Sequence, residues 1–287
     1  MKNAFRKTAV VAAVAAAAAM VAGTAFGASL DQIKKRGFIR IAIANEIPYG
    51  YVDLNGDAKG AGPDVAKYIV HQLGIKEINW ITTNFSSLIP GLQADRFDMV
   101  AAEQAINPDR CKKVIFSEPN SSYGEGLLVA KGNPKNVNAY SDFAKGDKKV
   151  AIMAGADQLD MMQKLGVPQS NIVTIASNAD AISTVATGRA AAYAATGLTA
   201  AELAQKSNKV QTVQDFKDPV IDGKTVRSWG AFTFASDSKD LRDAVNKVLV
   251  KYKKTDDWKK TLKSYGFTDA DLKASFEKTT ADLCSGK

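Results

Sequence analysis

The stretch IANEIPYGY, residues 43–51, places a carboxylate, a proline and two tyrosines at the end of an apolar run. Glu46 carries a negative charge, Pro48 fixes the local backbone, and the ring of Tyr49 offers a flat apolar face. This combination suits a small organic cation, because the electron-rich face of an aromatic ring attracts positive charge. A loop carboxylate beside unrelated tyrosines is the alternative, and the stretch taken alone favours neither.

A second charged group, Arg110, follows a helix start signal in NPDRCKKV. Asn107 can cap the helix and Pro108 can take its first position, so Arg110 is expected in the first turn. A guanidinium there presents a planar fork beside free backbone N–H groups, which suits a carboxylate. A salt bridge from Arg110 to Asp109 or Glu118 is the alternative.

Strand-like apolar runs alternate with capped helices along most of the chain. The runs are FIRIAIA (38–44), INWITT (78–83), DMVAAE (98–103), KKVAIMAG (148–155), NIVTIA (171–176) and AAAYAA (190–195). After the last run, Thr199 and Glu202 have capping-box spacing. The alternation predicts an α/β fold with mainly parallel sheets flanked by helices. In such sheets ligands bind beyond the carboxyl ends of the strands, so Glu46 and Arg110 are expected to border one cleft.

Residues 1–27 have the pattern of a cleaved secretory signal, in which basic residues precede an alanine-rich run and small residues precede a cut after Gly27. A lone membrane anchor is the alternative, but the run is shorter than the roughly 20 strongly apolar residues of a span. Cleavage predicts a periplasmic protein. Loss of Lys2, Arg6 and Lys7 lowers the net formal charge from +8 to +5. The remaining lysines are scattered, which predicts a solvated surface and no nucleic-acid partner.

The remaining chain, about 260 residues long, exceeds what one hydrophobic core usually holds, so the sequence predicts two lobes. The chain is expected to leave the first lobe, build the second and return, with crossovers near 117–125 and 225–232 that form a hinge. The predicted boundaries are 28–121 plus 228–287 for lobe 1 and 122–227 for lobe 2.

Cys111 and Cys284 are the only cysteines. In an oxidising compartment an even pair most simply forms a disulfide, and two buried thiols are the alternative. Such a bond would hold the C-terminal helix against lobe 1. The single histidine, His71, has no second ligand at metal-binding spacing, so we expect no metal, and no motif indicates another cofactor.

Four segments, GPDVAKYI, LIPGLQADRFD, NPDRCKKVIFSEP and KSYGF, resemble the extracytoplasmic solute-binding proteins of amino-acid-type (family 3) ABC importers. The resemblance spans essentially the whole mature chain. Within that family the ANE-x-P-aromatic turn, PDVA, PxRC and the terminal LC are similar to the ectoine and hydroxyectoine binders. The resemblance implies two α/β lobes that close on a buried ligand about a hinge, and a membrane permease as partner. We expect a monomer.

By the same resemblance, Glu46 matches the carboxylate that pairs with the ligand cation. Tyr49 and Phe85 match two faces of an aromatic cage, and Arg110 matches the arginine that holds the ligand carboxylate. Core packing is the alternative for Phe85.

Three positions depart from the family pattern. The third aromatic of the ectoine cage falls at Ala105, and a lobe-two threonine that would bind the carboxylate falls at Asp157. The aspartate with which ordinary amino-acid binders hold the α-ammonium falls near Thr196. Asp157 also stands where a helix N-cap belongs, so capping alone is its alternative role.

Three further residues complete the predicted ligand-binding set. Glu103 and Gln104 are polar where the family is apolar. Trp229 stands at the second crossover, where it can close one side of the cleft or pack against the hinge.

The sequence therefore predicts a non-catalytic transport protein for a zwitterionic or cationic amino-acid-like solute of the ectoine type. A basic amino acid, an opine or an amine stays open as ligand. Two other functions also stay open. One is a secreted dehydratase-like enzyme with Glu103 as base, and the other is a chemosensory binding protein.

Overall fold

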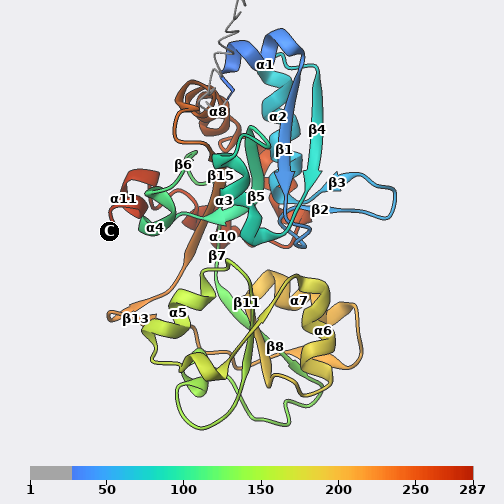
Figure 1. The fold of residues 1–287 in the computed structure, drawn as a ribbon, viewed down its shortest axis with the longest axis vertical. Coiled ribbons are helices and arrows are strands. Elements are labelled where there is room, and N and C mark those ends of the chain that lie inside the picture. Colours follow the sequence, from blue (N-terminus) through green and yellow to red (C-terminus); the bar gives the residue numbers. More distant parts are fainter. Residues whose placement is uncertain (1–27, 287) are drawn as a thin grey trace, which may run out of the picture.

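The computed structural model describes residues 28–286, which form two α/β lobes stacked along the long axis of the molecule (Figure 1). The predicted signal peptide lies outside the described residues. Within the described part of the chain no helix is long and apolar enough to cross a bilayer. The predicted α/β class, with sheets flanked by helices, is confirmed.

The first lobe is built on a sheet with the strand order β4-β1-β5-β15-β6. Its strands are β1 (Phe38–Ile43), β4 (Glu77–Thr82), β5 (Met99–Ala105), β6 (Ile115–Phe116) and β15 (Ser228–Phe234), and β7 (Ser121–Tyr123) also pairs with β15. β1 runs parallel to β4 and β5, whereas β15 is antiparallel to its neighbours. β1, β4 and β5 are parallel because helices connect them along the chain. β15 is antiparallel because the chain enters it from the other lobe.

Helices cover both faces of this sheet. They are α1 (Leu30–Arg36), α2 (Ala61–Gln72), α3 (Leu88–Gln93), α4 (Pro108–Cys111), α8 (Lys239–Tyr252), α9 (Asp256–Ser264), α10 (Asp269–Ala274) and α11 (Thr280–Cys284). Ile39 and Ile41 of β1 pack in one core with α2, α8 and α9, while Ala102 of β5 packs in another with α3. A 3₁₀ turn (Phe85–Ser87) precedes α3, and a short hairpin of β2 (Tyr51–Val52) and β3 (Ala58–Lys59) projects from the lobe.

The second lobe has a five-stranded sheet with the order β10-β9-β11-β8-β12. Its elements are β8 (Glu125–Ala130), β9 (Val150–Met153), β10 (Ile172–Ile175), β11 (Ala192–Thr196), β12 (Val210–Thr212), α5 (Gln158–Lys164), α6 (Asn178–Ala186), α7 (Gly197–Gln205) and the 3₁₀ turns Tyr140–Phe143 and Gln169–Asn171. β9 is parallel to β10 and β11, and β8 is antiparallel to β11 and β12. A hairpin of β13 (Val220–Ile221) and β14 (Lys224–Thr225) projects to one side of the molecule, beyond α5 (Figure 1).

Two adjacent strands carry the chain between the lobes. β7 continues through Gly124 into β8, and the chain returns from β14 into β15. Ser228 pairs with Tyr123 where these segments run antiparallel. Gly126 packs so closely on Gly197 that a Cβ there would lie 2.8 Å from the Gly197 Cα, which excludes any larger residue.

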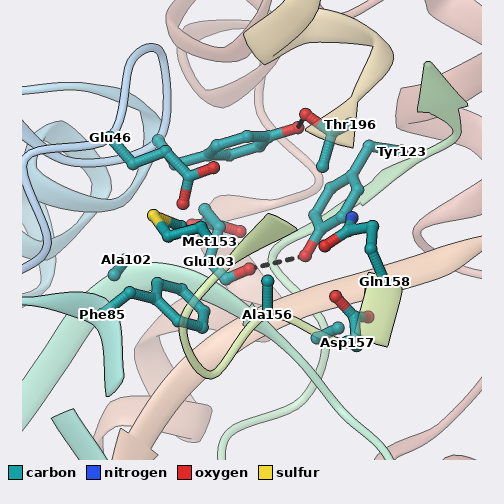
Figure 2. A pocket seen from close by; sticks show the side chains of 12 residues that line it. Glu46, Phe85, Ala102, Glu103, Tyr123, Met153, Ala156, Asp157, Gln158 and Thr196 are labelled. Carbon is teal, nitrogen blue, oxygen red and sulfur yellow. Dashed lines mark hydrogen bonds between the residues drawn. The ribbon is translucent and has the colours of Figure 1, made fainter. Parts of the chain in front are cut away.

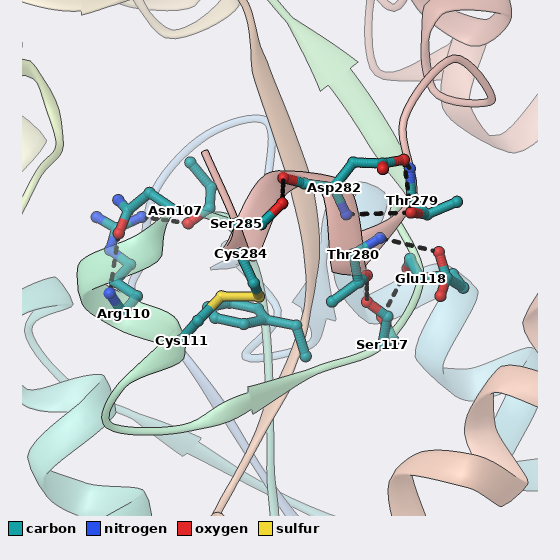
Figure 3. Close-up of a disulfide and its surroundings, with 12 residues drawn as sticks. Asn107, Arg110, Cys111, Ser117, Glu118, Thr279, Thr280, Asp282, Cys284 and Ser285 are labelled. Atoms are coloured by element: carbon teal, nitrogen blue, oxygen red, sulfur yellow. Dashed lines mark hydrogen bonds between the residues drawn. A yellow bond between two sulfur atoms is a disulfide. The ribbon is translucent and has the colours of Figure 1, made fainter. Parts of the chain in front are cut away.

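A disulfide joins Cys111 of α4 to Cys284 of α11, as predicted (Figure 3). The C-terminal helix is also held by Thr280, whose hydroxyl donates to the Ser117 carbonyl at 2.6 Å and whose N–H donates to Glu118 Oε2 at 3.1 Å. The last helix of the chain is therefore part of the first lobe and lies beside the helix that carries Arg110.

Candidate functional site

A small cavity lies between the lobes, with side chains of both around it (Figure 2). The first lobe contributes Glu46, Tyr49, Phe85, Ala102, Glu103, Ala105 and Tyr123, and the second contributes Met153, Ala156, Asp157, Gln158 and Thr196. The space open to the centre of a water-sized sphere is about 20 Å³, which is room for roughly one water molecule. We call this space the inner cavity. This space is too small for an amino-acid-sized solute.

Glu46 reaches the inner cavity from the tight turn that ends β1. The turn is closed by backbone bonds between Glu46 and Gly50, and it contains a cis Ile47–Pro48 peptide. The carboxylate is buried, and the Thr199 hydroxyl of the second lobe lies 3.2 Å from Glu46 Oε1 and 3.1 Å from the Ile47 carbonyl oxygen. Burial raises the pKa of Glu46 to about 7, while the bond from Thr199 opposes this rise. Burial at this position therefore favours the protonated form of the carboxyl group.

Three aromatic rings border the inner cavity. Tyr49 and Tyr123 lie with ring centroids 5.0 Å apart, and Phe85 lines the same cavity (Figure 2). Phe85 also packs in the hydrophobic core beside α3, which was the alternative expected for it. Tyr123 was missed by the sequence analysis, although it lies within the hinge stretch SEPNSSYGE. The rings supply the apolar, electron-rich surface that a cation centre prefers.

Arg110 lies in the first turn of α4, where the Asn107 side chain accepts from its N–H at 2.9 Å, as predicted. Its guanidinium donates to the Ala105 carbonyl at 2.8 Å and to the Gly155 carbonyl of the second lobe at 3.0 Å. It also stands 5.5 Å from the centre of the Phe85 ring. The alternative partners are engaged elsewhere, since Asp109 pairs with Lys112 and Glu118 accepts from Thr280. Arg110 therefore bridges the lobes at the edge of the inner cavity and is not part of its wall.

Glu103 and Gln104 occupy the end of β5 but have different surroundings. Glu103 lines the inner cavity, has a positive φ of 47°, and accepts hydrogen bonds from Asn120 Nδ2 and the Ser121 hydroxyl. Burial raises the pKa of Glu103 above its ordinary value. Gln104 is buried, its Oε1 has no hydrogen-bond partner among the described residues, and its side chain is not in the cavity wall.

Asp157 and Thr196 are the second-lobe residues of the predicted set, and both line the inner cavity. Asp157 stands at the N-cap position of α5, but its side chain makes no capping bond, so capping does not explain it. Thr196 caps α7 by accepting from the Thr199 N–H at 3.1 Å and accepts from the Tyr49 hydroxyl at 2.8 Å. The expected cap at Thr199 is therefore wrong by three residues, because β11 ends and the helix begins before it.

Trp229 does not line the inner cavity. Its Nε1 donates to the Ala274 carbonyl at 2.8 Å, and the ring packs beside the hinge and borders a second, outer space. Trp229 therefore packs against the hinge, which was one of its two expected roles. It does not close the inner cavity, which was the other.

Glu125 is a buried carboxylate that the sequence analysis missed. It begins β8 just after the first crossover and accepts from Gln158 Nε2 at 2.7 Å and from the Tyr140 hydroxyl at 3.0 Å. Burial, reinforced by the nearby Asp157 carboxylate, raises its pKa well above the usual range. In the sequence, Glu125 is a single acidic residue directly before the apolar run GLLVA, and this position is the feature that could have indicated a buried carboxylate.

The sequence of the chain is similar to a known protein family and to several of its members. Residues 39–268 match the family described as bacterial extracellular solute-binding proteins, family 3. The chain is 58% identical over 279 residues to a probable amino-acid ABC transporter periplasmic-binding protein of Sinorhizobium fredii, across 96% of this chain and 93% of that relative. It is 25% identical to the lysine/arginine/ornithine-binding periplasmic protein of Escherichia coli, across 76% of this chain and 83% of that protein.

Two solved structures are similar over most of the chain. The crystal structure of EhuB in complex with hydroxyectoine has a TM-score of 0.81 and 30% identity, and the match covers 90% of this chain and 98% of that one. An ancestral amino acid-binding protein, described as a precursor of cyclohexadienyl dehydratase, has a TM-score of 0.72 and 30% identity, with 82% and 98% covered.

Proposed function

The chain belongs to the bacterial extracellular solute-binding proteins of family 3, and we propose that it captures a small zwitterionic or cationic amino-acid-like solute between its lobes. Family membership implies a small-molecule ligand, the membrane permease of an ABC transporter as partner, and a periplasmic location. In this proposal residues 1–27 are removed on export and the mature protein acts as a monomer.

The charge of the inner cavity is the observation that carries the proposed ligand chemistry. Glu46, Glu103 and Asp157 line it, while the nearest guanidinium, that of Arg110, bonds to carbonyls at its edge. Carboxyl groups gathered in a dehydrated space are unfavourable when charged, unless protons or a cationic ligand balance them. A positive centre beside Glu46 and the rings meets that need, and a ligand carboxylate can take the place of the carbonyls on Arg110.

Ectoine and hydroxyectoine fit this description, because each combines a delocalised cation with a carboxylate. The similarity to the hydroxyectoine complex of EhuB supports this class. Basic amino acids, opines and amines remain alternative ligands, and the similarity to a lysine/arginine/ornithine-binding protein supports the first of these. The small residue at Ala105, in place of a third ring, gives room to the larger candidates.

The proposed binding cycle uses the two strands that join the lobes. The predicted boundaries, 28–121 with 228–287 and 122–227, fall in the two hinge strands. Because β7 pairs with β15, we propose that Tyr123 moves with the first lobe. Separation of the lobes breaks the contacts of Tyr49 with Thr196, Glu46 with Thr199, and Arg110 with Gly155. These side chains then become free to meet the ligand, which restores the closed state with contacts of its own.

A catalytic role is not part of the proposal. Glu103 was the candidate base, but its two carboxylate oxygens accept from Asn120 and Ser121, so neither is directed freely at a substrate proton.

A thermal-shift panel tests the proposal directly. It compares ectoine, hydroxyectoine, betaines, basic amino acids, opines and polyamines with succinate, a dicarboxylate that lacks a cation. A ligand at 100 times its dissociation constant stabilises the folded state by about 2.7 kcal/mol. We expect at least one cationic compound to raise the melting temperature and succinate to leave it unchanged. Stabilisation by succinate alone, or by no compound of the panel, contradicts the proposed ligand class.

A further inference from the structure

The end of the second lobe that faces away from the first lobe is built from four connecting segments. They lie where β8 ends and where β9, β10, β11 and β12 begin, and they comprise residues 131–149, 165–171, 187–191 and 206–209. We call this part of the surface the distal end, and it lies at the bottom of the molecule in Figure 1.

Basic side chains gather at the distal end. Residues 131–149 contribute five lysines, 187–191 contribute Arg189, and 206–209 contribute Lys206 and Lys209, whereas the acidic side chains of the four segments are Asp142 and Asp147. Eight positive and two negative charges give +6, and because residues 28–287 total +5, the rest of those residues carry −1. The fold therefore brings lysines that are scattered in the sequence to one end of the molecule.

The far end of the first lobe, by comparison, is nearly balanced in charge. The segments beyond its sheet, 28–37, 73–76, 94–98 and 235–238, contain five basic and four acidic side chains, a net of +1. One of these acids, Asp98, pairs with Arg36. None of the eight basic side chains of the distal end has an ion-pair partner among residues 28–286, and seven of the eight are exposed.

Backbone bonds hold the basic segments of the distal end side by side. The Lys131 N–H donates to the Lys209 carbonyl at 2.9 Å, and the Ala191 N–H donates to the Lys149 carbonyl at 2.7 Å. A hollow of about 270 Å³ lies between two of the segments, and its charged border consists of Lys135, Asp147, Lys148, Lys149 and Arg189. The distal end is thus a fixed array of cations around a shallow space that can admit a phosphate group.

The side chains around these cations indicate what kind of anionic partner fits. The aromatic side chains of the four segments, Tyr140 and Phe143, are fully buried, so no ring is available to stack on the bases of a nucleic acid. The exposed large apolar side chains of the described chain are Leu54, Val220, Val250 and Phe276, and all lie outside the distal end. A broad array of ammonium groups without an apolar wedge fits the headgroup layer of an anionic bilayer.

We propose that the distal end is a docking surface for the membrane, where it binds anionic phospholipid headgroups reversibly. This inference goes beyond solute binding and rests on the proposed function only for the nearby bilayer, because a protein that delivers solute to a membrane permease works beside one. Docking keeps the protein in the layer where the permease lies. Since no side chain of the distal end inserts among acyl chains, the attraction is electrostatic and falls off within a Debye length.

Vesicle co-sedimentation tests the docking surface on the mature protein without solute. Vesicles of phosphatidylglycerol and phosphatidylcholine in equal parts are compared with vesicles of phosphatidylcholine alone. At about 0.1 M salt, where the Debye length is about 10 Å, we expect at least about tenfold tighter binding to the anionic vesicles. This binding should be lost at about 1 M salt, where the Debye length is about 3 Å.

Equal binding to both kinds of vesicle, no binding to either, or binding that persists at the higher salt overturns the proposal. Because these measurements contain no solute and the thermal-shift panel contains no lipid, such a failure leaves the proposed function standing.

Charge reversal locates the surface on the molecule. The double variant Lys135→Glu/Lys149→Glu should bind anionic vesicles at least about tenfold more weakly and keep the melting temperature of the parent, since both side chains are exposed. The control Lys247→Glu/Lys260→Glu changes the net charge equally at exposed positions of α8 and α9, and it should bind as the parent does. Equal weakening in both variants attributes binding to net charge, and an unchanged affinity in the first variant places the contact elsewhere. Either result overturns the assignment.

Two soluble competitors separate a membrane surface from other anions. Sodium phosphate is compared with sodium chloride at equal ionic strength, and a single-stranded DNA oligonucleotide is added at the phosphate concentration of the exposed lipid. We expect phosphate to release no more protein from the vesicles than chloride does, and the oligonucleotide to release less than about half. Release by phosphate alone indicates a site for the free ion, and larger release by the oligonucleotide indicates a nucleic-acid surface. Either outcome overturns the assignment to lipid.

Discussion

The Tyr49 hydroxyl donates a 2.8 Å hydrogen bond across the interlobe gap to Thr196, the residue that caps α7. The same two side chains line the inner cavity. The groups that hold the lobes together here are therefore also ones that we propose to meet the ligand. Ligand binding and lobe closure are then linked through an exchange of partners.

Tyr49→Phe should shift the ligand-free protein toward the open arrangement. The substitution removes one buried interlobe bond and keeps the ring, so the closed state should lose about 0.5 to 1.5 kcal/mol. Solution scattering without ligand should give a larger radius of gyration than for the parent. Tyr123→Phe is the matched control, because its hydroxyl donates to Glu103 within one lobe. An effect of equal size in the control would contradict the interlobe explanation.

Removal of the disulfide should destabilise the fold. The bond joins residues separated by 173 positions, and the chain-entropy model assigns such a loop about 5 kcal/mol, with typical measured losses of 2 to 5 kcal/mol. Guanidinium denaturation of the Cys111→Ser/Cys284→Ser variant should show a lower midpoint than that of the oxidised parent. The parent in reductant should unfold as the variant does. Coincident curves for all three would show that the bond contributes nothing to stability.

The ligand-free protein should lose stability as the pH rises above about 4.5. The pKa of Glu46 rises from 4.5 to about 7 on folding, and that of Glu125 rises as well, so the folded state holds protons that the unfolded state releases. Stability falls with pH wherever the folded state binds more protons, which here extends from about 4.5 to neutral pH.

Glu125→Gln should weaken this pH dependence, because the amide keeps an acceptor for Gln158 and Tyr140 and does not titrate. Melting temperatures measured from pH 5 to 8 should fall less steeply than in the parent. Glu277→Gln, at an exposed position, is the control and should follow the parent. A parent whose stability rises over this range would refute the assignment.

Features set by sequence neighbours were predictable. The helix start at Asn107 and Pro108 depends on side-chain-to-backbone bonds within four residues. The alternation of strands and helices predicted the α/β sheets, and the presence of two cysteines predicted the disulfide. Each depends on local geometry or on chemistry that a single residue type carries.

Partners from the other lobe were not predictable. Arg110 meets the Gly155 carbonyl 45 residues away, and Glu46 meets Thr199 153 residues away. Nothing in the local sequence of either residue specifies those distances. Glu125 was missed for the same reason, since its burial follows from Tyr140 and Gln158, which close around it only in the folded lobe.

The affinity of Glu46→Gln and Arg110→Met for a cationic ligand tests the central claim most directly. Calorimetry with the best ligand of the thermal-shift panel should show each variant binding at least about 30-fold more weakly, because loss of a buried charged partner costs about 2 kcal/mol or more. Asp109→Asn is the control, since Asp109 neighbours Arg110 but is exposed and pairs with Lys112, and it should bind as the parent does. If Glu46→Gln and Arg110→Met both retain the parent affinity, the ligand is held elsewhere and the account of the interlobe cleft is wrong.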